Sequence, residues 1–376
     1  MTVTLRGLRT AVPNTVLVQE QVRDVFASQP GLSRLAQRLV PTSFNVSGIE
    51  TRYSVIEELT FDEIAGEREF FDASSGELLM PGTKVRNELY ISEATKLYVE
   101  AGRQAIDAVD DVSASDITHV ITVSCTGFYA PGPDYMIVRE LGLGAAVQRY
   151  HLGFMGCYAT MPALRLAKQL VEADADAVVL VVSVELCTLH LRSSNDPDTI
   201  VASSLFADGA GAGIVSSRLP AAGEIALGLD RFETVITPVG EADMAWKIGD
   251  NGFEMILSTY VPHIIDDHIE GAIAPLLAPE PELAADPAGS VAHWAIHPGG
   301  RSILDRVESK LALSEAQLVP ARETLRDFGN MSSATIAFVL RNILDNGAKD
   351  GDRLLAMAFG PGLTVETGLM TVLDGS

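Results

Sequence analysis

The sequence has few basic side chains. It carries 27 Lys and Arg against 50 Asp and Glu in 376 residues, which gives a formal net charge of −23. Proteins that bind nucleic acids cluster Lys and Arg, because neutralising phosphates releases counterions. The charge balance therefore argues against nucleic acid as a main partner. We interpret the excess of acid as a solvated surface that favours solubility.

Long apolar segments are also missing. The longest strongly apolar run, Ala177 to Val184, is far shorter than the roughly 20 residues that span a bilayer. The first residues contain no apolar stretch of the length that a secretory signal needs. These absences predict a cytoplasmic protein with no membrane span.

Cysteine is scarce, with three residues, Cys125, Cys157 and Cys187, and no CxxC pair. An odd number of Cys in a long chain fits reduced thiols better than a disulfide framework or a zinc site. No Walker A sequence is present, and no Gly-x-Gly-x-x-Gly follows a predicted strand. We therefore predict no bound metal and no resident cofactor.

Continuous aliphatic runs predict strands that are buried on both faces, and helical periodicity lies between them. The composition, 47% hydrophobic with 32 Gly, supports a large core. Strands alternating with helices predict an α/β fold with a mainly parallel sheet. A capping-box spacing at Thr60 and Glu63 predicts a further helix there. The predicted strands are 119–125, 177–184, 209–217, 291–297 and 354–359, and the clearest helices are 159–173 and 332–344.

Similar elements recur at nearly one spacing. His119 aligns with His293 at an offset of 174 residues, Ala159 with Ala334 at 175, and Asp176 with Asp352 at 176. A shared offset over three element types predicts two similar α/β halves, which we assign to residues 1–225 and 226–376.

Three residues at element ends are candidates for chemistry. Cys157 directly precedes a predicted helix, whose N-terminus would stabilise a thiolate, although a lone Cys is more often a small buried hydrophobe. His297 ends a predicted strand and is followed by a Pro-Gly-Gly turn. Asn330 lies before the second helix, where an N-cap is the simplest role. A thiol, an imidazole and an amide are together the inventory for acyl transfer on a cysteine.

Five segments resemble the type III polyketide synthases, the chalcone-synthase-like group of the thiolase superfamily. The resemblance runs from about residue 5 to residue 372 and implies a thiolase-like fold of layered α/β/α/β/α type, and a homodimer. It also implies that Cys157 carries the acyl group, while His297 and Asn330 polarise thioester carbonyls. The segments are GFMGCYATMPALRLAKQL, SSLFADGAGAGIV, WAIHPGG, DFGNMSSAT and AFGPGLTVET.

The same resemblance assigns further residues. Phe206 and Phe253 match the two gatekeeper phenylalanines, and Arg38 and Arg52 are the candidates for contact with coenzyme A. The cavity wall is assigned to Cys125, Thr126, Cys187, His190, Met244 and Ser332.

The implied substrates are acyl-CoA and malonyl-CoA. Similarity to bacterial members suggests fatty acyl starters and alkylpyrone or alkylresorcinol products. Two alternatives stay open: a β-ketoacyl-acyl-carrier-protein synthase III-like enzyme, and a catalytically silent thiolase-fold protein that binds acyl-CoA.

Overall fold

The computed structural model describes residues 1–63, 66 and 68–375, and its centre is one nine-stranded sheet. The strand order across the sheet is β13-β14-β15-β10-β1-β9-β8-β6-β7. The strands are β1 Thr4–Ala11, β6 His119–Ser124, β7 Gln148–Gly153, β8 Val178–Leu186, β9 Asp208–Ser216, β10 Ile225–Ile236, β13 His293–Ile296, β14 Arg353–Gly360 and β15 Thr364–Asp374.

The sheet consists of two similar halves that meet where β1 pairs with β10. In one half, β6 and β8 pair in parallel, and the pairs β8–β9 and β9–β1 are antiparallel. In the other half, β13 and β14 pair in parallel, and the pairs β14–β15 and β15–β10 are antiparallel. The same sequence of directions in both halves confirms the duplication. The predicted division at residue 225 falls on the first residue of β10.

The prediction of a mainly parallel sheet is wrong. Only the pairs β6–β7, β6–β8 and β13–β14 are parallel among the described residues, and the five remaining pairs of the large sheet are antiparallel. The apolar runs do mark burial, since every residue of β8 and β9 is buried. Helices cover both faces of these strands, so a continuous apolar run here reports the helix cover and carries no information on strand direction.

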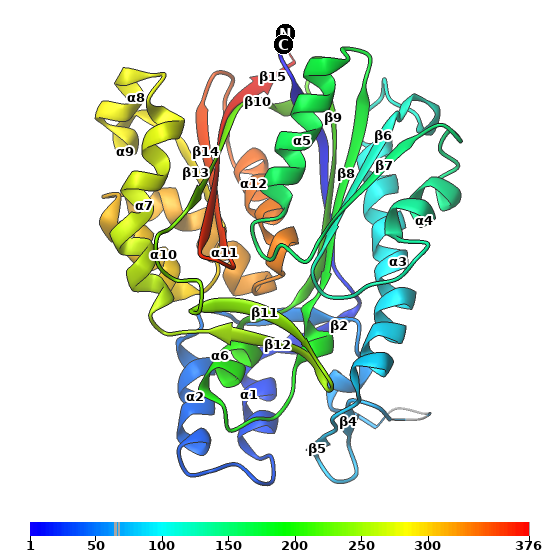
Figure 1. Cartoon of the computed structure of the whole chain (residues 1–376), viewed down its shortest axis with the longest axis vertical. Helices are drawn as coiled ribbons and strands as arrows, with labels where there is room; N and C mark the ends of the chain where they lie inside the picture. The colour runs from blue at the N-terminus through cyan, green and yellow to red at the C-terminus, as the bar shows by residue number, and fades with distance from the viewer. Residues whose placement is uncertain (64–65, 67, 376) are drawn as a thin grey trace.

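Helices form three layers around the two half-sheets (Figure 1). α3 (Thr83–Asp107) packs on the outer face of β1, β8 and β9, and α7 (Val261–Leu277) packs on β10 and β15. Between the half-sheets lie α5 (Thr160–Ala173), which contacts strands of both halves, and α12 (Thr335–Asp345), which contacts β1, β9 and β13. This arrangement is the layered α/β/α/β/α body that was predicted.

The two helices predicted most clearly are present as α5 and, after a 3-10 turn at Ser332–Ala334, α12. At Thr60, a 3-10 helix (Glu57–Thr60) ends instead of a helix beginning, and the predicted helix extends into residues 64–65 and 67, which lie outside the described residues. In the part of the chain that is described, no helix is both long and apolar enough to cross a bilayer.

Smaller elements gather at the end of the sheet that is opposite the two chain termini (Figure 1). Several of them line the two cavities that are described in the next section. They are α1 Gln19–Ala27, α2 Ala36–Val46, α6 Pro197–Leu205 and the hairpins β2 Thr15–Val18 with β3 Thr51–Ser54, β4 Phe71–Asp72 with β5 Glu77–Leu78, and β11 Met244–Gly249 with β12 Gly252–Leu257. The remaining helices are α4 Pro133–Glu140, α8 Pro281–Ala285, α9 Pro287–Ser290, α10 Arg301–Lys310 and α11 Glu315–Phe328.

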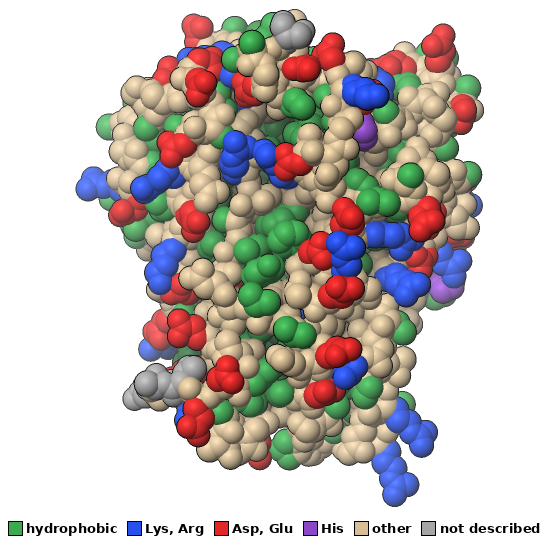
Figure 2. All heavy atoms as spheres, turned by 180° about the vertical axis from the view of Figure 1, so that it is seen from behind, with side chains coloured by type: hydrophobic (Ala, Val, Ile, Leu, Met, Phe, Trp, Pro, Cys, Tyr) green, Lys and Arg blue, Asp and Glu red, His purple; other side chains and the backbone are tan. Residues whose placement is uncertain are grey.

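The surface is charged but mixed in sign. On the face shown in Figure 2, basic side chains lie among the more numerous acidic ones, and hydrophobic side chains are exposed along its middle.

Candidate active site

Two cavities meet at Cys157. We call the first the inner cavity, with an empty volume of about 640 Å³, and the second the outer cavity, with about 1320 Å³ counted to its open mouth. Four side chains line both and so stand at the passage between them: Cys157, Phe206, Met244 and Met255. His297 and Asn330 line the outer cavity with Cys157. The structure thus brings the three predicted residues to one space.

A tight turn presents Cys157 directly before α5. Gly156 has φ +90°, and a Cβ there would come within 2.5 Å of Pro361 in the Gly-Pro-Gly loop that follows β14. Only glycine fits both the dihedral angle and the space. The Gly-Pro-Gly loop therefore shapes the turn that carries the thiol, a role that its sequence alone did not reveal.

The Cys157 side chain is 7% exposed, and burial raises the pKa of its thiol to about 12, against a smaller lowering by a hydrogen bond with Ser332. The N-terminus of α5, which was expected to stabilise a thiolate, favours the opposite shift. Desolvation of the charged sulfur outweighs the favourable dipole. Burial therefore favours the neutral thiol form of Cys157.

His297 lies just beyond the end of β13, where its backbone N–H donates to the Met357 carbonyl at 2.8 Å. The ring is buried, and neither Nδ1 nor Nε2 has a hydrogen-bond partner among the described residues. Burial lowers the pKa of this imidazole to about 3, so the ring is neutral at physiological pH. Buried nitrogens without partners are costly, and a ligand in the outer cavity would supply what they lack.

Asn330 is not a helix cap, because the N-cap of α12 is Ala334. Its Oδ1 accepts the Ser332 backbone N–H at 2.9 Å, and its Nδ2 donates to the Gly299 carbonyl at 3.2 Å. Since the Ser332 donor fixes which end of the amide is oxygen, the NH₂ group is defined, and it has a second hydrogen to offer. A parallel bridge ties Asn330 to Phe206.

All six residues that were assigned to the cavity wall line the inner cavity, and so does Phe253. Phe206 lies at the passage between the cavities. Ser332 has a left-handed backbone conformation (φ +48°), and its hydroxyl lies 3.4 Å from the Cys125 sulfur. A strained non-glycine residue in a cavity wall is typical of functional sites.

The assignment of Arg52 to coenzyme A contact is wrong. Arg52 is fully buried, its Nη1 donates to the carbonyls of Ser203 and Phe206, and burial lowers its pKa to about 9. Arg38 is exposed on α2 and lines neither cavity. The arginines that line the outer cavity are Arg301 and Arg306 on α10. Arg301 follows the His-Pro-Gly-Gly turn directly, and this adjacency was the signal that sequence reasoning missed.

A buried carboxylate behind the inner cavity was also missed. Glu185, at the end of β8, is 0% exposed and accepts hydrogen bonds from the Cys125 N–H and the Thr126 hydroxyl, both at 2.9 Å. Ser333 donates to its other oxygen. Burial raises the pKa of Glu185 although these donors oppose the shift. An acid directly after an eight-residue apolar run was the available sequence signal.

No group of three or more His, Cys, Asp or Glu side chains within the described residues is arranged to hold a metal ion.

Comparison with known proteins matches almost the whole chain. Residues 2–218 match the family model of the N-terminal domain of chalcone and stilbene synthases, and residues 230–374 match that of the C-terminal domain.

Similar solved structures include PKS-I from the brown alga Ectocarpus siliculosus (26% identity, 99% of this chain and 98% of the other, TM-score 0.88). The C-terminal type III polyketide synthase domain of Steely1 from Dictyostelium is 25% identical, with 99% of each chain covered and a TM-score of 0.88. The 1,3,6,8-tetrahydroxynaphthalene synthase of Streptomyces coelicolor A3(2), a bacterial type III polyketide synthase, is 25% identical, with 99% of each chain covered and a TM-score of 0.85.

Proposed function

The chain belongs to the chalcone and stilbene synthase family of type III polyketide synthases, which are acyl-CoA condensing transferases, and from this premise we propose a specific reaction. It condenses a fatty acyl-CoA starter with malonyl-CoA on Cys157 and cyclises the product to an alkylpyrone or an alkylresorcinol. The observation that carries this proposal is the meeting of Cys157, the unpartnered His297 ring and the Asn330 amide in one cavity.

The first step is transfer of the starter to Cys157. Because the thiol and the imidazole are both neutral at rest, the sulfur attacks the thioester carbonyl as its proton passes to His297. Coenzyme A leaves as its thiol after taking that proton, and the starter remains on the enzyme as a Cys157 thioester.

The second step is decarboxylation of malonyl-CoA. Loss of CO₂ leaves an enolate, whose oxygen needs hydrogen-bond donors that are already in place. An N–H of the neutral His297 ring and the free hydrogen of the Asn330 NH₂ group are such donors. Phe206, at the passage between the cavities, offers an apolar face that disfavours the malonyl carboxylate and favours its loss. The enolate carbon then attacks the Cys157 thioester, and the Cys157 sulfur leaves as a thiolate that regains a proton. The chain, longer by two carbons, is now a thioester of coenzyme A and returns to Cys157 for the next extension as the starter did.

The inner cavity supports the choice of a fatty starter. Its wall is largely apolar, with Phe206, Met244, Trp246, Phe253 and Met255 facing it. Each methylene that leaves water for such a wall contributes about 0.8 kcal/mol.

Arg301 and Arg306 stand where an anionic substrate enters the outer cavity. The Arg301 side chain is 59% exposed, and its Nε lies 3.7 Å from Asp305, which leaves its guanidinium free to meet phosphate groups. In a protein of net charge −23, two arginines at this mouth give a local attraction for coenzyme A.

The proposal includes a homodimer and a cytoplasmic location. The exposed hydrophobic strip in Figure 2 supports an interface. Light scattering of the purified protein measures the mass directly, and a mass near 40 kDa would contradict the dimer.

The deciding experiment is a panel of C6 to C20 acyl-CoA starters with malonyl-CoA, with CO₂ release and products measured by mass spectrometry. We expect pyrone or resorcinol products from the wild type and none from Cys157→Ala. His297→Ala and Asn330→Ala should each lower malonyl-CoA decarboxylation about 100-fold, as loss of one oxyanion donor does. Arg301→Ala should raise the KM for malonyl-CoA several-fold, with Arg38→Ala as the matched control that leaves it unchanged. A panel with neither CO₂ nor product would reject the proposal.

A further inference from the structure

The hairpin β11–β12 supplies walls to both cavities although it is not part of the large sheet. Its inward side chains are Met244, Trp246, Phe253 and Met255. A two-stranded hairpin is marginally stable on its own, so its position depends on what holds it from outside.

The tip of the hairpin is tied to the start of α3. The Thr83 backbone N–H donates to the Asp250 carbonyl at 2.8 Å, and the Thr83 hydroxyl accepts the Gly252 N–H at 2.9 Å. The same hydroxyl donates to the Gly249 carbonyl. These bonds fix the turn but do not reach the part of the hairpin that faces the inner cavity.

Trp246 and His190 hold that part, and the Trp246 Nε1–H donates to the Cys125 carbonyl at 2.7 Å. The contacts of His190 are the more numerous. Its Nδ1 accepts the Phe253 backbone N–H at 3.0 Å, and its Nε2 donates to the Thr126 carbonyl at 2.8 Å. The two partners fix the tautomer, because an N–H donor requires a bare Nδ1 and a carbonyl requires a protonated Nε2. The imidazole also stacks on the Phe253 ring, with centroids 4.2 Å apart and planes at 11°.

The surroundings of His190 are close-packed. Arg86 donates to the backbone carbonyls of Leu189 and Leu191, the two neighbours of His190 in the chain. A Cβ on Gly252, whose φ is +106°, would lie 3.0 Å from Arg86 and 3.3 Å from the His190 Nδ1. The hairpin backbone therefore comes this close to the imidazole because residue 252 has no side chain.

We infer that His190 is a positioning residue, which holds Phe253 and the hairpin against the inner cavity and thereby fixes the shape of that cavity. The inference rests on the proposed function for its kinetic effect. Both ring nitrogens are engaged, and burial keeps the ring neutral, so His190 does not exchange protons with substrate. Beside its place in the inner-cavity wall, its hydrogen bond and its ring stack act on Phe253 and the hairpin.

A double-mutant cycle tests this route. We expect His190→Leu to lower kcat about 10-fold, to broaden the range of product lengths and to leave the KM for malonyl-CoA within about 2-fold, since the outer cavity is untouched. His190→Asn keeps an acceptor near the Nδ1 position and should recover kcat to within about 3-fold of the wild type. Phe253→Leu removes the stacked ring but keeps the backbone N–H of residue 253, so in this background His190→Leu should lower kcat by less than it does in the wild type. Fully additive effects would overturn the inference.

Fluorescence gives a readout that does not need turnover. Trp246 packs edge-on against both His190 and Phe253, at 5.5 Å and 5.7 Å, and the second tryptophan, Trp294, is removed by Trp294→Phe. In that background His190→Leu should at least double the acrylamide quenching constant of Trp246, whereas the control His268→Asn should leave it unchanged. Unchanged quenching in His190→Leu overturns the inference, even if no starter gives product. Greater quenching without any product supports the anchoring and rejects the proposed function alone.

Discussion

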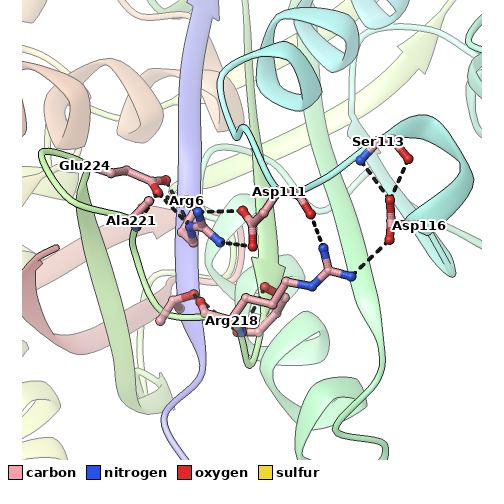
Figure 3. A network of polar contacts seen from close by, with 9 residues as sticks. Arg6, Asp111, Ser113, Asp116, Arg218, Ala221 and Glu224 are labelled. Carbon is pink, nitrogen blue, oxygen red and sulfur yellow. Dashed lines mark hydrogen bonds and ion pairs between the residues drawn. The ribbon is translucent and has the colours of Figure 1, made fainter.

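Two buried polar networks at opposite ends of the sheet balance charge in different ways. At the end near the chain termini, the Arg6 side chain is 1% exposed and is paired with Asp111 and Glu224 at 2.8 and 2.5 Å (Figure 3). Arg218 extends this network to Asp116. At the site, Glu185 is equally buried but receives only neutral donors, and no ion pair to it is found among the described residues.

The carboxyl pKa values of the two networks shift in opposite directions. Hydrogen bonds from Ser113 and Arg218 lower the pKa of Asp116 to about 2, and Arg6 lowers that of Asp111. Burial raises the pKa of Glu185. Burial also raises the pKa of Asp208, which accepts the Thr188 backbone N–H beside the inner cavity, to about 7. The first network stabilises the fold by pairing charge. In the second, Glu185 has no ion-pair partner among the described residues, and Asp208 is attracted by the buried Arg52. Buried carboxyl groups with raised pKa values are common at functional sites.

The largest contrast is expected from alanine at two glycines with positive φ. Gly156→Ala brings a Cβ to 2.5 Å from Pro361, so we expect a loss of about 3 kcal/mol in unfolding free energy and about a 100-fold lower product rate. Gly223→Ala, beside the Arg6 network, meets no atom within 4 Å and should cost about 1 kcal/mol from backbone strain. Denaturant unfolding and product formation measure both. Equal costs at the two positions would show that the Gly156 turn tolerates displacement.

Removal of Arg6 should come next in size. Arg6→Met leaves two carboxylates without their cation, but Asp111 is 50% exposed and can regain water, so we expect a loss of about 2 kcal/mol. Activity per folded molecule should not change, because the network lies far from both cavities. Arg23→Met, at an exposed pair, is the control and should leave the free energy of unfolding unchanged within error. A drop in specific activity for Arg6→Met would show that the Arg6 network affects the active site at the other end of the sheet.

The comparison also explains what could be predicted from the sequence. Cys157, His297 and Asn330 were found because each lies at an element end that local patterns reveal, and the repeat placed the first and third in equivalent positions. Glu185 was missed because its donors come from distant segments, Cys125–Thr126 and Ser333, which only the folded sheet brings together. For the same reason the burial of Arg52 and the desolvation of the Cys157 thiol could not be predicted from neighbours in the chain.

The pH dependence of stability should separate the two networks. Because the folded pKa of Asp208 is raised, the folded state keeps a proton between about pH 3.8 and 7 that the unfolded chain has lost, and stability falls as pH rises through this window. One such proton amounts to at most about 1.4 kcal/mol per pH unit. Asp208→Asn should remove this slope relative to the wild type.

Asp111 gives the opposite sign. Its lowered pKa stabilises the fold above about pH 3.8, and this stabilisation is lost as the pH falls below that value. Asp111→Asn should therefore flatten the acid side alone. Urea unfolding at several pH values measures both variants, and the same slope change in both would contradict the assignment.

The smallest effect on stability should come from Glu185→Gln. The amide oxygen can accept from the Cys125 N–H and the Thr126 hydroxyl, while its NH₂ faces the Ser333 hydroxyl, which can reverse and accept. Loss of a buried charge offsets the weaker hydrogen bonds, so we expect a change below about 1 kcal/mol at pH 7. The control Glu185→Ala leaves the Cys125 and Thr126 donors without an acceptor and should cost about 3 kcal/mol. If Gln were as costly as Ala, the carboxylate charge itself would be needed, and some cation at the site would have to balance it as Arg6 is balanced at the other end.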